Sequence, residues 1–178
     1  VHHRDSLGRD EITDVFYKLG VVKREQGDRR KALNMFDKAL EEDATHRPTL
    51  EAVVGLYETS SDWEQVIHFK KQILEQLDGD ERFAMLETIG DLWAEKLKNS
   101  SKAIEHYALA SEMKPKNHKI LHKLLGLYQS TKQWDQAVEI IERVSGLVSD
   151  MDVSDETKKG QQSKYAYTIG VIIRDEVK

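Results

Sequence analysis

The sequence predicts an all-α protein built from stacked pairs of short helices, and two observations lead to this fold class. First, the composition suits amphipathic helices: 33% of the 178 residues are charged, 39% are hydrophobic, and only two are proline. Second, one pattern of apolar residues recurs along most of the chain. Helix pairs that share a pattern are expected to stack, because one pair alone cannot bury its apolar face.

The first clear copy of the pattern lies in residues 19–46, LGVVKREQGDRRKALNMFDKALEEDATH. Leu19 and Gly20 place a bulky side chain beside a gap on the first helix, and Gly27 and Asp28 supply a tight turn. The second helix then carries an apolar stripe with spacings of four and three residues: Ala32, Phe36 and Ala39. We expect this helix to pack closely at the gap through its small residues.

The pattern returns three more times. A close copy occupies residues 86–118, and two others begin at Leu50 and Leu121, of which the copy at Leu50 is the weakest. The copy in residues 86–118 contains Gly90, Ala103 and Tyr107 in matching places and has one additional residue, which we place in its turn at 98–100. Pro115 ends its second helix, because proline cannot continue a helix.

This arrangement resembles the tetratricopeptide repeat family, whose 34-residue signature is W-x2-L-G-x2-Y, then A-x3-F, then P. The resemblance covers about residues 13–151. It implies a right-handed α-α superhelix of about four helix-turn-helix repeats plus one extra C-terminal helix. Two departures are Lys23, where the first repeat should carry Tyr, and Lys70, where the second should carry Phe.

The repeat starts divide the chain into six predicted segments. These are an N-terminal extension or the tail of a preceding unit (1–12), repeat 1 (13–46), a degenerate repeat 2 (47–82), repeat 3 (83–117), repeat 4 (118–151), and a linker with the first helix of a truncated fifth repeat (152–178). In repeat 2, Gln76 and Leu77 favour a longer second helix. After a loop at 149–153, we expect a last helix capped by Ser154 or Asp155.

The resemblance also implies a binding surface, because the first helices of such repeats line a concave groove. The predicted partner-binding residues are Tyr17, Glu51, Glu58, Glu87, Asp91, Lys119, His122 and Lys123. Further groove positions include Arg24, Gly55, Thr59 and Gly126, and the two glycines leave room for an extended peptide or a helix. The basic run at 29–31 is expected on the outer face.

The charges along the groove predict an acidic middle and a basic C-terminal part. Carboxylates on a concave surface attract a basic or extended partner segment, although a charge run is also often just solvated. Chaperone-binding members of the family hold a C-terminal carboxylate with Lys, Asn and Arg side chains. At those places this chain has Tyr17, Val21, Glu87 and Asp91, so no such clamp is predicted.

Several classes of chemistry have no motif in the sequence. The absence of cysteine excludes disulfides and thiolate sites, and neither a G-x-S-x-G turn nor a Gly-rich phosphate loop occurs. His118 and His122 share a helix face but lack a third ligand, so no metal site is predicted. The net charge of −5 gives no overall positive potential that would attract nucleic acid. The sequence has no run of about 18 apolar residues, so no membrane helix is predicted.

We therefore expect a non-catalytic protein–protein interaction module without a cofactor, a cytoplasmic scaffold or adaptor segment of a larger protein. Its partner would be a protein or peptide segment, with no nucleic acid or membrane involved. Two alternatives stay open: a structural spacer that self-associates through its open ends, and a regulatory part of a larger enzyme. The first alternative predicts oligomers that grow with concentration.

Overall fold

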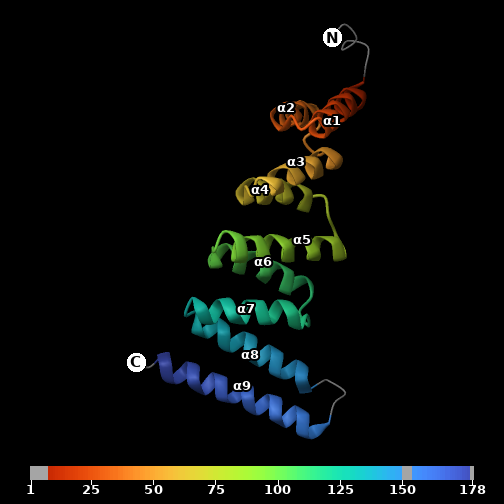
Figure 1. Cartoon of the computed structure of the whole chain (residues 1–178). Helices are drawn as coiled ribbons and strands as arrows, with labels where there is room; N and C mark the ends of the chain where they lie inside the picture. The colour runs from red at the N-terminus through yellow and green to blue at the C-terminus, as the bar shows by residue number, and fades with distance from the viewer. Residues whose placement is uncertain (1–7, 150–153, 177–178) are drawn as a thin grey trace. The chain divides into compact units, whose positions relative to one another are not determined.

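The computed structural model describes residues 8–149 and 154–176, and every regular element in them is helical (Figure 1). Consecutive helices form pairs, and one further helix follows at the C-terminal end, which confirms the predicted fold class. The chain divides into two compact units, Val1–Met85 and Leu86–Lys178. In the described residues, no helix is both long enough and apolar enough to span a membrane.

The first unit contains two complete helix pairs. Its helices are α1 (Arg9–Glu25), α2 (Arg29–Glu42), α3 (Arg47–Thr59) and α4 (Trp63–Leu74), followed by the start of α5 (Gly79–Asp91). α1 packs on α2 and α3 on α4, while α2 also contacts α3 (Figure 1). The predicted stripe of Ala32, Phe36 and Ala39 is fully buried, as its helical spacing requires.

The second unit continues from α5 through the remaining helices. They are a π-helical turn (Leu92–Lys96), α6 (Ser100–Met113), α7 (His118–Ser130), α8 (Trp134–Ser149) and α9 (Asp155–Glu176). α6 packs on α7, α7 on α8, and α8 on α9 (Figure 1). Ile172 of α9 is buried in a cluster with Ala137 and Ile141 of α8, so α9 covers the last complete pair.

Two glycines set the distance between the helices of a pair. A Cβ atom on Gly20 would lie 2.4 Å from the Phe36 ring, and one on Gly90 would lie 2.4 Å from the Tyr107 ring. The gap beside Leu19 is therefore filled by an aromatic ring of the second helix. This differs from the expectation that small residues fill it.

The two pairs without this glycine use a different combination of volumes. In the second pair Val54 is buried at the place of Gly20, and Lys70 replaces the ring and turns to Glu58, at 3.3 Å. In the fourth pair Leu125 is partly buried and packs with the cluster that contains Ile141. A larger residue on the first helix thus accompanies a smaller or displaced one on the second.

Each turn within a pair has the same backbone geometry. One residue has a positive φ between 52° and 75°, and these residues are Gly27, Ser61, Lys98 and Lys132. The next residue donates its backbone N–H to the first helix, as Asp28 does to the Lys23 carbonyl at 3.0 Å. Asp28 and Asp62 also cap the second helices of their pairs with their side chains.

The additional residue of the third pair lies in the helix, where the sequence predicted it in the turn. Leu97 donates to the carbonyl of Leu92, which makes one π-helical turn, and Asn99 donates to Trp93 at 2.8 Å. That last bond spans six residues, whereas the bond from Asp28 to Lys23 spans five. A π-helical turn absorbs one inserted residue and leaves the turn geometry unchanged.

Two helix boundaries differ from the sequence predictions. α1 begins at Arg9, inside the predicted extension, where the Gly8 N–H donates to the Glu11 carboxylate at 2.9 Å. The prediction of a longer second helix in repeat 2 is wrong, because α4 ends at Leu74. Arg82 donates to the Leu74 carbonyl at 2.8 Å and so satisfies this helix end.

The C-terminal helix begins where the sequence predicted. α9 starts at Asp155, and the Ser154 hydroxyl accepts from the Thr157 N–H at 3.4 Å, which confirms Ser154 as its cap. Most of the loop predicted at 149–153 lies outside the described residues, and Ser149 itself belongs to α8.

The glycine at the close approach can be tested against a glycine in open space. Gly20→Ala should lower the free energy of unfolding by about 2 kcal/mol, because the methyl group meets the Phe36 ring. Gly55→Ala, also within a helix but with nothing within 4 Å of its Cβ, should raise it by about 0.5–1 kcal/mol. Chemical denaturation of both variants measures the difference, and equal effects would refute this account of the gap.

Candidate functional site

The predicted partner-binding residues lie on first helices in both units, and we describe each unit by itself. In the first unit Tyr17 of α1 is half-buried, and its ring packs against Phe36 at 6.1 Å and His46 at 5.5 Å between centroids. These contacts fix the ring between its own pair and the start of α3. Tyr17 thus presents one edge, and the rest of its surface is part of the core.

The two predicted acidic anchors of the first unit both have a cation of this chain beside them. Glu51 accepts from the Arg47 guanidinium at 2.9 Å, and Arg47 also lies 3.7 Å from Glu81. Glu58 lies 3.3 Å from the Lys70 ammonium. The Arg47 and Glu51 side chains are 46% and 56% exposed, so water screens this pair and it contributes little to stability. Glu58 is 44% exposed but Lys70 only 17%, so the second pair is partly buried.

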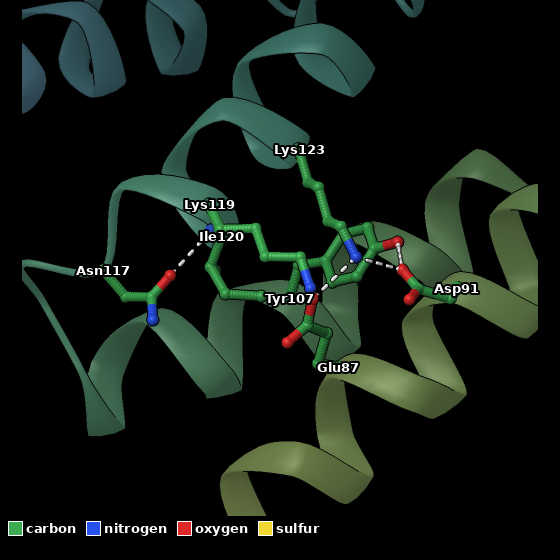
Figure 2. Close-up of polar contacts among 7 residues, drawn as sticks. All are labelled: Glu87, Asp91, Tyr107, Asn117, Lys119, Ile120 and Lys123. Atoms are coloured by element: carbon green, nitrogen blue, oxygen red, sulfur yellow. Dashed lines mark hydrogen bonds and ion pairs between the residues drawn. The ribbon is translucent and has the colours of Figure 1, made fainter.

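In the second unit, four predicted partner-binding residues form one polar cluster, shown in Figure 2: Glu87, Asp91, Lys119 and Lys123. Lys123 of α7 places its Nζ 2.8 Å from Glu87 Oε1 and 2.5 Å from Asp91 Oδ1, both on α5. Lys119 adds a second contact to Glu87 at 2.6 Å. We call these four residues and Tyr107 the Lys123 cluster.

Tyr107 of α6 completes the Lys123 cluster. Its hydroxyl donates to Asp91 Oδ1 at 2.5 Å, and the Lys123 Nζ lies 5.3 Å from the centre of its ring. The same ring fills the gap at Gly90, so the close approach of the second helix also positions the hydroxyl. Asn117 holds the start of α7 by accepting from the Ile120 N–H at 3.1 Å (Figure 2).

Burial and pairing shift the pKa values of the Lys123 cluster. Burial alone would raise the pKa of Glu87, but the hydrogen bonds from Lys119 and Lys123 outweigh it and lower this pKa below its ordinary value. Burial would lower the pKa of Lys123, and its bonds to Asp91 and Glu87 raise it instead. The pKa of Tyr107 is raised by burial and by its bond to Asp91. Glu87 is therefore ionised, Lys123 is charged and Tyr107 is neutral at neutral pH.

These contacts bear on the charge pattern that the sequence predicts. The acidic middle and the basic C-terminal part meet in the Lys123 cluster, where two carboxylates face two ammonium groups. Their charges cancel within the unit. A basic partner would therefore have to displace Lys123, whose side chain is only 24% exposed.

The histidines of α7 stay at the surface. His118 and His122 are both exposed, and no group of three or more His, Asp or Glu side chains in the described residues is arranged to hold a metal ion. His122 therefore remains a predicted contact of the partner.

A hollow opens on the first unit at three of the predicted groove positions. Its volume is about 430 Å³, and it is lined by Arg24, Gly27, Arg29, Gly55, Leu56 and Thr59. We call it the Arg24–Arg29 hollow. Gly55 leaves it open, because no atom lies within 4 Å of the position where a Cβ would be. Arg29 was expected on the outer face with the basic run at 29–31, and the structure places it at the hollow instead.

Arg29 reaches the hollow because it is the first residue of α2 and leans toward the next pair. Its Nη2 donates to the Ser60 hydroxyl at 2.8 Å, and its guanidinium lies 5.4 Å from the centre of the Tyr57 ring. Both partners belong to the second pair. The signal in the sequence is the position directly after the Gly27-Asp28 turn, where a long side chain can cross to the neighbouring repeat.

Comparison with known proteins supports the repeat assignment. Residues 14–46 match the sequence profile of the tetratricopeptide repeat family. No curated protein sequence matches the chain.

Solved structures with tetratricopeptide repeats have the same fold. The N-terminal domain of stress-induced protein-1 from C. elegans matches with a TM-score of 0.51 and 17% identity, over 68% of this chain and 98% of that domain. A MamA protein matches with a TM-score of 0.50 and 19% identity, over 94% and 93% of the two chains. YrrB matches with a TM-score of 0.50 and 14% identity, over 90% and 76%. At these identities the likeness concerns the fold alone.

The Lys123 cluster can be tested by removing its central cation. Lys123→Met should lower the free energy of unfolding by about 2 kcal/mol, because it leaves two carboxylates partly buried without this partner. Lys119→Met is the matched control and should cost less than about 1 kcal/mol, because its side chain is 68% exposed. Denaturation at neutral pH measures both, and equal losses would contradict the cluster as described.

The same denaturation experiment repeated across pH gives a second reading of the cluster. The folded-state pKa of Glu87 lies below its ordinary value of 4.5, so its contribution is present above pH 4.5 and is lost as the pH falls through the folded pKa. Glu87→Gln should remove this part of the acid destabilisation. An unchanged pH profile in that variant would show that Glu87 is not stabilised by its lysines.

Proposed function

Because this chain is a tetratricopeptide repeat protein, we propose that it is a non-catalytic scaffold module that holds an extended segment of a partner protein against its first helices. Members of the family bind protein or peptide partners on such surfaces, and YrrB is described as "a TPR protein with an unusual peptide-binding site". The likeness to YrrB supports the general role and leaves the contact residues to this chain.

The observation that carries this proposal is the Arg24–Arg29 hollow. Its volume of about 430 Å³ lies within the usual range of small-ligand sites and accommodates a few side chains of an extended segment. Arg24, Gly55 and Thr59 line it, and all three are groove positions that the resemblance predicts. An extended peptide needs this kind of side-chain-free surface in order to approach the helix backbone.

The predicted anchors contribute unequally to this proposal. Glu51 sits in an exposed pair, so a partner can exchange with Arg47 at little cost. Glu58 neutralises Lys70, whose side chain is only 17% exposed, so exchange there costs more. The carboxylates of the Lys123 cluster are held inward, and we assign them a structural role. We assign Tyr17 and His122 additional contacts with the partner segment, and Lys119 is an exposed cation beside them in the proposal.

A blocked hollow tests the proposal. A displayed peptide library is selected on the intact chain, and the affinities of the selected peptides are measured by fluorescence polarisation. Gly55→Trp should weaken their binding by at least about tenfold, because no atom lies within 4 Å of the Gly55 Cβ position and the indole can fill the hollow that this position lines.

Gly146→Trp in α8 is the matched control, since its Cβ position is equally open and it lies on a second helix outside the predicted groove, and it should bind the peptides as the unchanged chain does. Peptides that tolerate Gly55→Trp, or a library that yields none, would overturn the proposal.

A second candidate function is self-association, and a stripe on α1 favours it. Val15, Leu19 and Val22 are 46%, 43% and 45% exposed and share one helix face. In α3 the residues at the same places, Thr49, Val53 and Leu56, are buried. The exposed stripe thus matches a face that is covered elsewhere in this unit.

Leu19→Glu tests this second candidate. If the stripe joins copies of the chain, light scattering should show a mass that rises with concentration for the unchanged chain and a constant monomer mass for the variant. Leu19 is already exposed, so the variant should remain folded. A monomer at all concentrations in both samples would exclude this role.

A further inference from the structure

The Arg24–Arg29 hollow contains two guanidinium groups and no carboxylate among the residues that line it. In the part of the chain that the structure describes, the Arg24 side chain has no hydrogen bond or ion pair. Arg29 has only a hydroxyl and an aromatic ring beside it, at Ser60 and Tyr57. The charged residues predicted to bind the partner differ from these two cations, because each of them has an ion pair within the chain: Glu51, Glu58, Glu87, Asp91, Lys119 and Lys123.

The acidic residue that adjoins Arg29 in the sequence is already engaged. Asp28 precedes Arg29 and caps α2 by accepting from the Lys31 N–H at 3.1 Å, and it pairs with the Lys31 ammonium at 2.8 Å. Hydrogen bonds from the Lys31 side chain and backbone lower the pKa of Asp28. Asp28 therefore stays ionised in a fixed position, and no ion pair joins it to either arginine of the hollow.

The arginine geometry suits an anion more than a neutral group. A guanidinium has five N–H donors in a planar fork, and Arg29 uses one of them for Ser60. The ring of Tyr57 holds the Arg29 guanidinium from one side, which reduces the entropy that it loses on binding. Arg24 approaches from the end of α1 with all its donors available, so the two forks can bind one carboxylate or phosphate together.

We propose that the Arg24–Arg29 hollow binds an anionic group of the partner segment, either a carboxylate or a phosphate. This inference rests on the proposed function and specifies which chemistry the segment brings. Gly27 and Gly55 line the hollow without side chains, so the anion can approach both guanidinium groups from the solvent side. A segment with an acidic group here is favoured over one that is basic throughout, because the cations of the hollow repel the latter.

Short synthetic peptides test the anion directly. The probes are Ac-Gly-Ser-X-Ser-Gly-NH2, in which X is glutamate, phosphoserine, alanine or lysine, and an uncapped peptide with a free C-terminal carboxylate. Each is titrated into the full chain while the arginine Nε–Hε signals are followed by NMR. We expect the signals of Arg24 and Arg29 to shift with the anionic probes and to stay unchanged with the alanine and lysine probes. The anionic probe that binds most tightly shows whether the hollow prefers a side-chain carboxylate, a phosphate or a C-terminal carboxylate.

Three variants connect this binding to the hollow. Arg24→Gln should weaken the anionic probes by about tenfold, and it is the cleanest variant because this side chain has no partner in the described residues. Arg29→Lys keeps the charge but loses the fork, and it should also weaken the binding of the phosphoserine and glutamate probes. Arg30→Gln is the matched control, since Arg30 is exposed on the same helix but does not line the hollow, and it should change nothing.

Each contrary result has a separate meaning. If no anionic probe shifts the two arginines, if the lysine probe binds equally well, or if Arg30→Gln causes the same loss as Arg24→Gln, the anion assignment is wrong. Library peptides that require an open Gly55 but tolerate Arg24→Gln would also overturn the anion assignment, and they would leave the proposed function standing. A library that yields no Gly55-dependent peptide overturns the proposed function itself.

Discussion

The close contact between the two helices of each pair is the constraint on which the rest of the structure depends. Where the first helix has a glycine, the ring of Phe36 or Tyr107 occupies the space that any Cβ would need. This contact brings the two helix axes close together and fixes their rotation, since the ring enters at one position only. It also decides what the ring can do, because Tyr107 reaches Asp91 only from this place.

The turn within each pair transmits this arrangement along the chain. A residue with positive φ reverses the direction, and the following residue returns a backbone hydrogen bond to the first helix. The third pair keeps this geometry despite its additional residue, because a π-helical turn at Leu92–Lys96 absorbs it. The backbone geometry of the turn is thus kept while the helix before it changes to absorb the additional residue. The polar, loop-like composition of the turn would suggest the opposite.

The sequence predicted the fold class and the buried stripes well, because helical periodicity is a local property that a single chain displays. The contacts made by the side chains of the predicted groove were harder to predict from the sequence. Lys123 pairs with Glu87 and Asp91, which are 36 and 32 residues away, and no local pattern reports such a distance. Arg29 was misplaced for the same reason, since its direction depends on Tyr57 and Ser60 of the next pair.

The same contacts explain why the paired and unpaired charges of the first-helix positions have different consequences for recognition. A partner cation that binds Glu58 replaces an existing contact with Lys70, so one ion pair is exchanged for another and the net gain is small. An anion that binds Arg24 replaces only water, and the fork of Arg29 is already oriented by Tyr57. Specificity is therefore expected to follow the unpaired arginines, although carboxylates outnumber the cations in this chain. The carboxylates predicted to bind a partner are neutralised by lysines and arginines of their own unit, whereas the two arginines of the hollow have no ion pair in the described residues.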